Sequence, residues 1–183
     1  PKAENVDYSD ETVMLEVKNL SAKRRFKDVN FKLHKGEILG FGGLSDCGMH
    51  EIGRAAYGLE KLTSGEVLRE GKPVTSCLKA IEMEIGYISK NRDTEALILE
   101  APIQDNIVLP SLRSLAKKIG FISPKAEKKM SEKEIDSFRI KCGSGRQWVN
   151  TLSGGNKQKV SFGKWTARNS KVIIMDCPTR GVD

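Results

Sequence analysis

Short stretches in which apolar residues alternate with polar ones, or run unbroken for a few positions, recur along the first ninety residues and predict β-strands. A helix is expected over residues 49–57. It is expected to end before Gly58, because glycine commonly follows the last helical residue. The expected strands are residues 14–20, 29–33, 37–41 and 85–89, together with a hairpin over 64–74 that turns at Glu70-Gly71.

The pattern changes after residue 92, where apolar residues recur at helical spacing. Ser123-Pro124 is typical of a helix start, and that helix is expected to run to about Ile140. A long amphipathic helix ending near Arg168 is expected before a final strand over 171–175. Strands that alternate with helices predict an α/β fold with a largely parallel core and an inserted helical subdomain.

Changes in composition along the chain suggest how it is organised. We expect a polar linker over residues 1–12, a core over 13–92, a helical subdomain over 93–150, and a return to the core over 151–183. The chain begins without methionine and stops directly after a strong strand, so we expect a piece of a longer polypeptide.

Overall composition excludes several classes of protein. Apolar residues make up 38% of the 183 residues, so disorder along the whole chain is not expected. No apolar run approaches the roughly 20 residues that span a bilayer. The four cysteines are scattered and there are only two histidines, so neither a disulfide framework nor a zinc site is expected. The net charge of +7 fits a lysine-rich solvated surface as well as nucleic acid, an anionic membrane or a phosphate-bearing ligand.

The segment before the first expected helix has the glycine spacing of a phosphate-binding loop, G-x-x-x-x-G-K-[ST]. In such loops the N–H groups of a glycine-rich turn and of a helix N-terminus bind phosphate oxygens. Gly43 and Gly48 keep the spacing, but Met49 replaces the lysine and His50 replaces the hydroxyl that binds Mg²⁺. Asp46 adds a negative charge inside the loop. By themselves the two glycines also fit an ordinary strand–turn–helix.

Residues 152–156, Leu-Ser-Gly-Gly-Asn, are a more specific signal. A hydroxyl and two glycines at a helix N-terminus form a compact anion clamp, although a capped helix start would also use them. The final apolar strand ends at Asp176, where an acid beside a phosphate loop is placed to hold Mg²⁺ through water. Cys177 follows at a position where a general base for water attack is commonly an acid, and a thiol is a poor substitute. A strand that ends in aspartate is by itself common.

Together and in this order, these segments resemble the ATP-binding-cassette (ABC) ATPases. The chain is most similar to the second nucleotide-binding domain of the tandem ATP-binding subunits of bacterial monosaccharide importers, of the ribose, galactose and xylose type. The resemblance implies a P-loop NTPase fold of ABC type, with a mostly parallel core sheet, an N-terminal antiparallel β region and an inserted helical subdomain, truncated after the Walker B strand and its following loop. It is carried by the glycine loop 43–50, Lys35–Gly40, Ser64-Gly65, Tyr87–Ser89 with Arg92, Leu152–Val160 and Pro178–Asp183.

The resemblance also implies roles for single residues, and departures from the family pattern. No catalytic residue is expected, because Cys177 stands at the usual glutamate position. As a separate departure, Lys90-Asn91 stands where the family usually has an acidic pair, although Arg92 remains. Asp176 is a candidate Mg²⁺ ligand, through water. The degenerate phosphate loop of the domain itself comprises Gly43, Ser45, Gly48, Met49 and His50, and the signature that reaches ATP on a sister domain comprises Ser153, Gly154, Gly155, Asn156 and Gln158.

These roles imply that two domains close head to tail and contribute different parts of each ATP site. The chain would supply its signature to the ATP site of the sister domain, while its own site would hydrolyse ATP very slowly or not at all. The implied cofactors are ATP and Mg²⁺. The implied partners are a sister nucleotide-binding domain on the same polypeptide, membrane permease subunits and, indirectly, a substrate-binding protein, at the cytoplasmic face of the bacterial membrane.

Three alternatives remain open from the sequence. Related subunits serve nucleoside importers. An ABC-type ATPase outside transport would use the positive charge on nucleic acid, although the basic runs at 23–27 and 125–129 lack the interleaved aromatics that stack on bases, and no nucleic acid is expected. A pseudo-ATPase that only positions a permease would make no contact with ATP through its signature.

Overall fold

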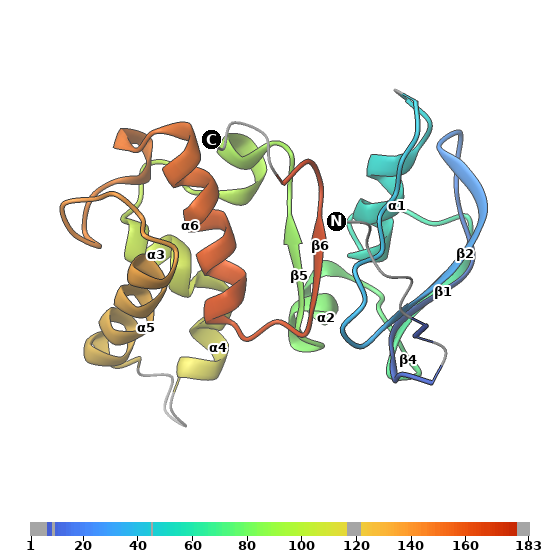
Figure 1. The fold of residues 1–183 in the computed structure, drawn as a ribbon, viewed down its shortest axis with the longest axis horizontal. Coiled ribbons are helices and arrows are strands. Elements are labelled where there is room, and N and C mark those ends of the chain that lie inside the picture. The colour runs from blue at the N-terminus through green and yellow to red at the C-terminus, as the bar shows by residue number, and fades with distance from the viewer. Residues whose placement is uncertain (1–6, 9, 45, 117–121, 179–183) are drawn as a thin grey trace. The chain divides into compact units, whose positions relative to one another are not determined.

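The N-terminal part of the chain forms an antiparallel sheet in the strand order β2-β1-β3-β4, which Figure 1 shows in blue and cyan. The computed structural model describes residues 7–8, 10–44, 46–116 and 122–178. The chain divides at Ile85–Gly86 into two units. The strands of the N-terminal unit are β1 (Val13–Ala22), β2 (Phe26–His34), β3 (Ser64–Arg69) and β4 (Lys72–Pro73).

These strands confirm the antiparallel β region and the hairpin. The turn between β3 and β4 has Glu70 at φ 51° and Gly71 at φ 73°, and two positive φ angles are what a two-residue hairpin turn requires. Within β1, Leu15, Val17 and Leu20 are buried, and Val17 lies opposite Val67 of β3. The core of this unit therefore lies on one face of β1.

The strand expected over residues 37–41 is not formed, and this prediction was wrong. The segment is irregular, Ile38 is 97% exposed, and Phe41 makes an edge-on contact with the Phe31 ring at a centroid distance of 5.0 Å. A strand is stable only when neighbouring strands accept its hydrogen bonds and its side chains are covered. Among the described residues the four strands of this unit pair with one another, so the apolar pattern of 37–41 has no ladder to join.

Two short helices complete the N-terminal unit. Helix α1 (Met49–Ala56) ends as expected, with Gly58 at φ 83° and its N–H bonded to Ala55 O at 2.9 Å. Helix α2 (Cys77–Glu82) was not anticipated, because six residues carry little periodicity. Ser76 marks its start, since the serine side chain accepts a hydrogen bond from the N–H of Lys79.

The C-terminal unit places helices around a small parallel sheet. Strand β5 (Ile85–Ile88) pairs with β6 (Val172–Met175), and the two run side by side in Figure 1 with helix α6 next to them. The N–H of Asp176 donates to Ile88 O at 2.8 Å. The intervening helical elements are a π-turn (Arg92–Ala96), α3 (Ile103–Val108), a 3₁₀ turn (Leu109–Ser111), α4 (Leu112–Leu115), α5 (Pro124–Ser137), a 3₁₀ turn (Val149–Thr151) and α6 (Gly154–Ala167).

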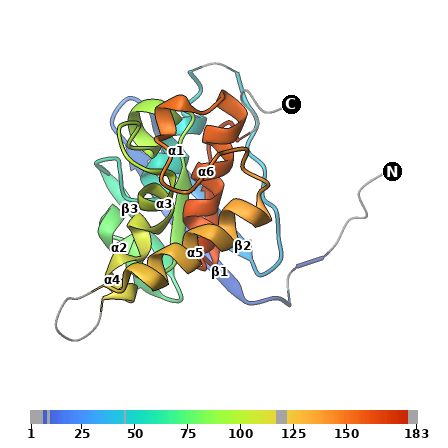
Figure 2. The ribbon, with the colours of Figure 1, turned by 90° about the vertical axis from the view of Figure 1, so that its left-hand side faces the viewer.

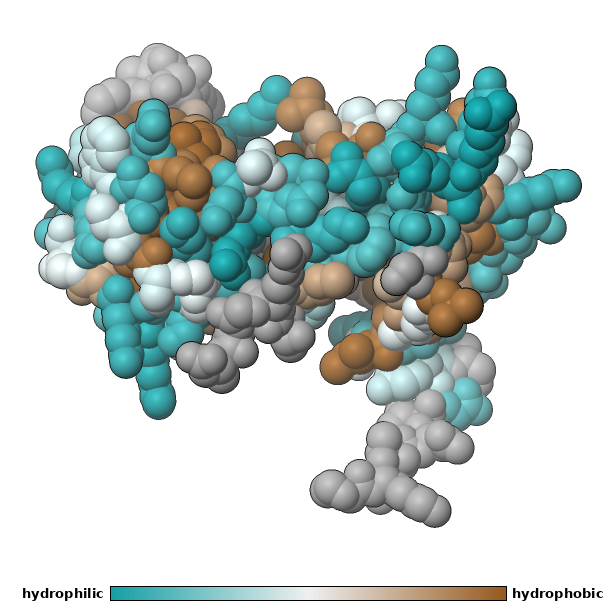
Figure 3. Space-filling view, turned by 90° about the horizontal axis from the view of Figure 1, so that it is seen from above, coloured by the Kyte–Doolittle hydropathy of each residue, from teal (hydrophilic) through white to brown (hydrophobic). Residues whose placement is uncertain are grey.

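Helices α3, α5 and α6 pack on one another around an aliphatic core (Figure 2). Ile103 and Ile107 of α3 and Val160 of α6 are fully buried in it, together with Val149. The helical periodicity of this region is therefore confirmed. None of the helices in the described parts of the chain is both long and apolar enough to cross a membrane. On the face drawn in Figure 3, apolar side chains reach the surface in separate patches among hydrophilic ones.

A glycine lets α6 approach β5 closely. A Cβ on Gly86 would lie 2.9 Å from ring atoms of Trp165, whose side chain is only 5% exposed. The indole therefore packs directly on the backbone of β5, and this contact fixes the position of α6 against the strand that leads to Ser89.

Candidate functional site

The glycine loop leads into helix α1. Gly48 is the N-cap residue of α1 at φ 89°, and Asp46 also has a left-handed conformation at φ 63°. Met49 and His50 form the start of the helix and are half-buried. Ser45, which the resemblance includes in this loop, lies outside the described residues.

Both glycines have packing reasons that need no ligand. A Cβ on Gly48 would collide with the backbone oxygen of Arg25, in the turn between β1 and β2. A Cβ on Gly43 would lie 2.5 Å from the Sγ of Cys47. The close approach of the Cys47 side chain to Gly43 and of the Arg25 backbone to Gly48 thus accounts for glycine at both positions, whether or not phosphate binds there.

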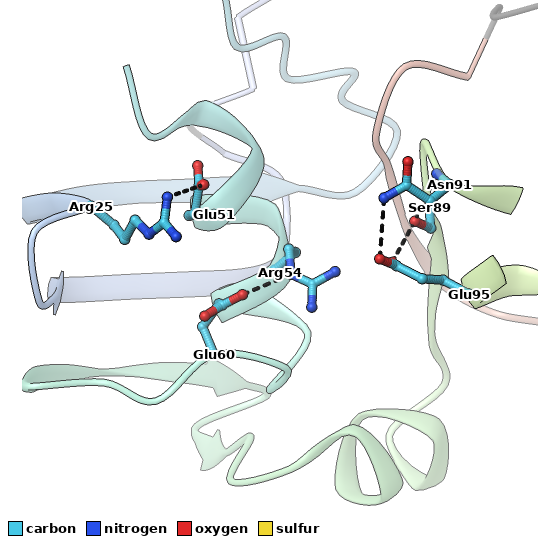
Figure 4. Close-up of polar contacts among 7 residues, drawn as sticks. All are labelled: Arg25, Glu51, Arg54, Glu60, Ser89, Asn91 and Glu95. Atoms are coloured by element: carbon cyan, nitrogen blue, oxygen red, sulfur yellow. Dashed lines mark hydrogen bonds and ion pairs between the residues drawn. The ribbon is translucent and has the colours of Figure 1, made fainter. Parts of the chain in front are cut away.

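Acidic side chains of the protein lie at the positive end of α1. Glu51 is in the first helical turn and accepts a hydrogen bond from Arg25 Nη1 at 3.1 Å (Figure 4). Asp46 precedes the helix within the loop. Carboxylates at a helix N-terminus are favourable there, and they compete with an external anion for the same positive potential.

An open pocket of about 490 Å³ lies beside the turn between β1 and β2. Phe26 is its one aromatic lining residue, and Arg24, Arg25 and Lys27 make it basic. No site was predicted here from the sequence, although an aromatic residue within a basic run was a signal for one. The remaining lining residues are Ser21, Ala22, Thr63 and Ser64.

The Leu-Ser-Gly-Gly-Asn segment forms the start of α6. Ser153 is the N-cap residue and is exposed, and Gly154 and Gly155 form the first turn. The amide of Asn156 contacts the Ser153 hydroxyl at 3.0 Å. A Cβ on Gly154 would lie 2.8 Å from Nη2 of Arg92, so the guanidinium lies against this turn. Ser153, the two glycines and Asn156 are thus brought together at one helix N-terminus.

Gln158 is placed differently from the rest of the signature. Its side chain is 3% exposed, and its Nε2 donates a hydrogen bond to Pro178 O at 3.0 Å. The amide therefore ties α6 to the segment that follows β6. A contact of Gln158 with ATP stays a prediction.

A polar cluster follows β5. Glu95 accepts hydrogen bonds from Ser89 Oγ at 2.7 Å and from Asn91 Nδ2 at 3.2 Å, as Figure 4 shows. The N–H of Asn91 donates to Ser89 Oγ at 3.1 Å. These bonds close the chain around the π-turn Arg92–Ala96, a type of distortion that is frequent at functional sites.

Two lysines of α6 hold this π-turn. Lys164 Nζ donates to Ala96 O at 2.7 Å, and Lys157 forms an ion pair with Asp93 at 3.6 Å. Burial lowers the pKa of Lys164 to about 8, because an ammonium group loses hydration there. The helix that begins with the signature is therefore attached at two points to the segment after β5.

The end of β6 presents the acid and the thiol singled out from the sequence. Asp176 is 9% exposed, and Cys177 is exposed at φ 50°. All four cysteines are free thiols. A carboxylate is the kind of ligand that Mg²⁺ prefers, so the donor chemistry of Asp176 fits that ion, whereas a thiol does not.

A family model described as ABC transporter matches residues 26–180. The chain is 45% identical over 173 residues to the ribose import ATP-binding protein RbsA of Lacticaseibacillus paracasei, a match that covers 93% of this chain and 34% of that protein. It is 39% identical over 185 residues to the putative ribose/galactose/methyl galactoside import ATP-binding protein 3 of Burkholderia cenocepacia, covering 100% of this chain and 36% of that protein. The chain thus spans about a third of the length of these curated relatives.

The fold is also similar to that of a solved structure, a dimeric ATP-binding cassette in a post-hydrolysis state bound to ADP and Pi. The TM-score is 0.79 at 22% sequence identity, and the match covers 93% of this chain and 76% of that chain. The likeness confirms the predicted cassette fold, with its antiparallel N-terminal sheet, helices and parallel strands.

Proposed function

Because the chain belongs to the ABC transporter family, we propose that it is an ATP-binding domain of a bacterial sugar importer that completes the ATP site of a sister cassette. The observation that carries this proposal is the contrast between two helix starts. The first turn of α6 presents the exposed hydroxyl of Ser153, whereas α1 begins with Met49 and His50 and has its own carboxylates at its N-terminus. The names of these relatives support sugar import, and ribose or galactose as the substrate class.

In this proposal the chain's own ATP site is inactive or very slow. Met49 cannot donate to a phosphate, His50 offers no hydroxyl for Mg²⁺, and Cys177 is a poor general base. The loss of a charged clamp or of a general base costs roughly 10² to 10⁴ in rate for each group. The carboxylates of Glu51 and Asp46 further weaken the binding of an anion at α1.

The signature acts on ATP that is held by the phosphate loop of the sister cassette. Ser153 and the N–H groups of Gly154 and Gly155 would bind the γ-phosphate at the positive end of α6. Asn156 lies beside Ser153. Gln158 supports α6 by donating a hydrogen bond to Pro178 O. In the chain's own site, Asp176 would hold Mg²⁺ through water, and the bound ion would neutralise charge on the phosphates there.

The partners follow from this function. The chain acts as the second cassette, with its sister on the same polypeptide, and it contacts permease subunits at the cytoplasmic face of the membrane and, indirectly, a substrate-binding protein. Hydrolysis coupled to transport is then a property of the full assembly. Residues 13–92 and 151–183 form the ATP-binding core in this arrangement, residues 93–150 the helical subdomain, and 1–12 the linker.

Two measurements test the proposal. Steady-state ATP hydrolysis by the isolated chain is expected to be near background, and brisk turnover would contradict a degenerate site. In the full transporter, Ser153→Arg is expected to abolish hydrolysis coupled to transport, because the long cation fills the place of the phosphate.

The matched control is Ser123→Arg. Ser123 is also the N-cap residue of a 14-residue helix, α5, and likewise makes no side-chain capping bond. This variant is expected to retain activity. If Ser153→Arg were as active as Ser123→Arg, the clamp role of the signature would be wrong.

A further inference from the structure

The amide of Asn156, in the first turn of α6, bridges two neighbours. Its Oδ1 accepts a hydrogen bond from the backbone N–H of Lys141 at 2.9 Å, and its Nδ2 donates to Oγ of Ser153 at 3.0 Å. A backbone N–H can only donate, so the amide oxygen has to face Lys141 and the NH₂ group has to face Ser153. Hydrogen-bond chemistry therefore determines the orientation of this amide.

That orientation decides what the hydroxyl of Ser153 can do. A serine hydroxyl has one O–H donor and two acceptor lone pairs, and the amide of Asn156 occupies one lone pair. The hydroxyl hydrogen therefore has to point away from Asn156, toward another acceptor. The side chain is exposed, so that acceptor can come from outside the chain.

A second observation supports the same assignment. Serine at an N-cap position usually accepts a hydrogen bond from an N–H of the first helical turn. Within the described residues, the side chain of Ser153 makes no such bond. The Ser153 hydroxyl is therefore held by Asn156 and not by the backbone of the helix. The N–H groups of the first turn of α6 remain available, with this hydroxyl, to bind an acceptor from outside the chain.

We propose that Asn156 is a positioning residue, which holds the Ser153 hydroxyl with its hydrogen directed at a phosphate oxygen of the ATP bound by the sister cassette. This inference rests on the proposed function, because that function supplies the phosphate. Lys141 provides the fixed end of the bridge, because it lies in the segment that follows α5. The same segment is linked to α6 a second time, since Lys159 Nζ donates to Arg139 O at 3.2 Å.

The chemistry of the side chain makes the inference testable. Aspartate has almost the same shape as asparagine, but both of its oxygens only accept. In Asn156→Asp one oxygen would still accept from Lys141 N–H, while the other would accept from the Ser153 hydroxyl and turn its hydrogen inward. The variant also adds a negative charge where a phosphate is expected. A nearly isosteric change thus reverses the direction of a single hydrogen bond.

The experiment measures kcat and KM for ATP in the full transporter. Asn156→Asp is expected to lower kcat by roughly a hundredfold to a thousandfold, the range seen when one transition-state donor is lost. As the pH falls from about 8 to about 5.5, the activity of this variant relative to the unchanged protein is expected to rise, because the bound phosphate raises the pKa of the adjacent carboxyl group and a protonated aspartic acid can donate to Ser153 again. A change that merely loosened the fold would not recover at acidic pH.

The chain offers a matched control in Gln147. Its Oε1 accepts from Gly143 N–H at 2.8 Å and its Nε2 donates to Thr151 Oγ1 at 2.8 Å, so it is also a bridging amide. Gln147→Glu makes the same chemical change just before the 3₁₀ turn Val149–Thr151, at the hydroxyl of Thr151 and not at that of Ser153. This control is expected to leave kcat unchanged, and an equal loss in both variants would overturn the inference.

A double-mutant cycle separates positioning from general stability. Ser153→Ala and Asn156→Ala are each expected to lower kcat, and the double variant is expected to be no worse than Ser153→Ala alone, because Asn156 acts through that serine. Additive losses would overturn the inference, as would a loss in Ser153→Ala with none in either Asn156 variant. If Ser153→Ala itself had no effect, the proposed function would be the part that fails.

Discussion

Lys164 provides a direct test of how α6 is attached to the π-turn. Its ammonium group is buried and donates to Ala96 O at 2.7 Å, and burial lowers its pKa from the ordinary 10.5 to about 8. Between these two values the unfolded chain holds the proton and the folded chain does not. Folding stability contributed by this group therefore rises as the pH increases from 8 to 10.5.

The size of the effect follows from the same values. A pKa difference between 10.5 and 8, at about 1.4 kcal/mol for each pH unit, corresponds to a change on the order of 3 kcal/mol. Below pH 8 the folded protein carries the full cost of burying the charged group, and above 10.5 that cost is gone. In Lys164→Met the cost is absent at every pH, while the bond to Ala96 O is lost.

The assay is urea unfolding of both proteins, followed by the fluorescence of Trp165 beside the lysine. The unchanged protein is expected to gain about 3 kcal/mol in the free energy of unfolding relative to Lys164→Met between pH 8 and pH 10.5. The comparison cancels the other groups that titrate in this range. A difference between the two proteins that stays constant with pH would refute the reasoning.

Two further predictions concern close packing and the basic pocket. Gly86→Ala is expected to lower the free energy of unfolding by about 1–3 kcal/mol, because its Cβ would lie 2.9 Å from Trp165 ring atoms. Gly42→Ala, at an exposed glycine with no atom within 4 Å of its Cβ position, is the control for packing, and an equal loss in both variants would contradict the explanation. Phe26→Ala is expected to weaken residual binding of a fluorescent ATP analogue to the isolated chain, because the pocket loses its stacking surface, while Phe138→Ala, in another part of the chain, is not. Equal titration curves for these two variants would show that the pocket does not hold the adenine base of the ATP analogue.

The elements with strong local patterns could be predicted from the sequence. The alternation in β1 and β2, the Glu70-Gly71 turn and the Ser123-Pro124 helix start were all recognisable, because each depends on neighbouring residues only. The strand over 37–41 was predicted wrongly because its formation depends on more than neighbouring residues. Its apolar pattern is that of a strand, but a strand also requires partners, and those are decided by residues far away in sequence.

The chemical identities on which the proposed function depends can be read from the order of amino acids alone. The missing lysine and hydroxyl at Met49 and His50, the Leu-Ser-Gly-Gly-Asn run and the thiol after Asp176 are properties of residue type and spacing. The family resemblance followed from their order along the chain.

How those groups are held is visible only in the folded chain. It showed that Gly48 is required for the approach of the Arg25 backbone, that Lys164 reaches Ala96, and that Asn156 joins Ser153 to Lys141. The last two contacts link residues 68 and 15 positions apart. A hydrogen bond depends on distance and direction between two groups, and for groups so far apart in sequence both are set by the packing of the elements that carry them.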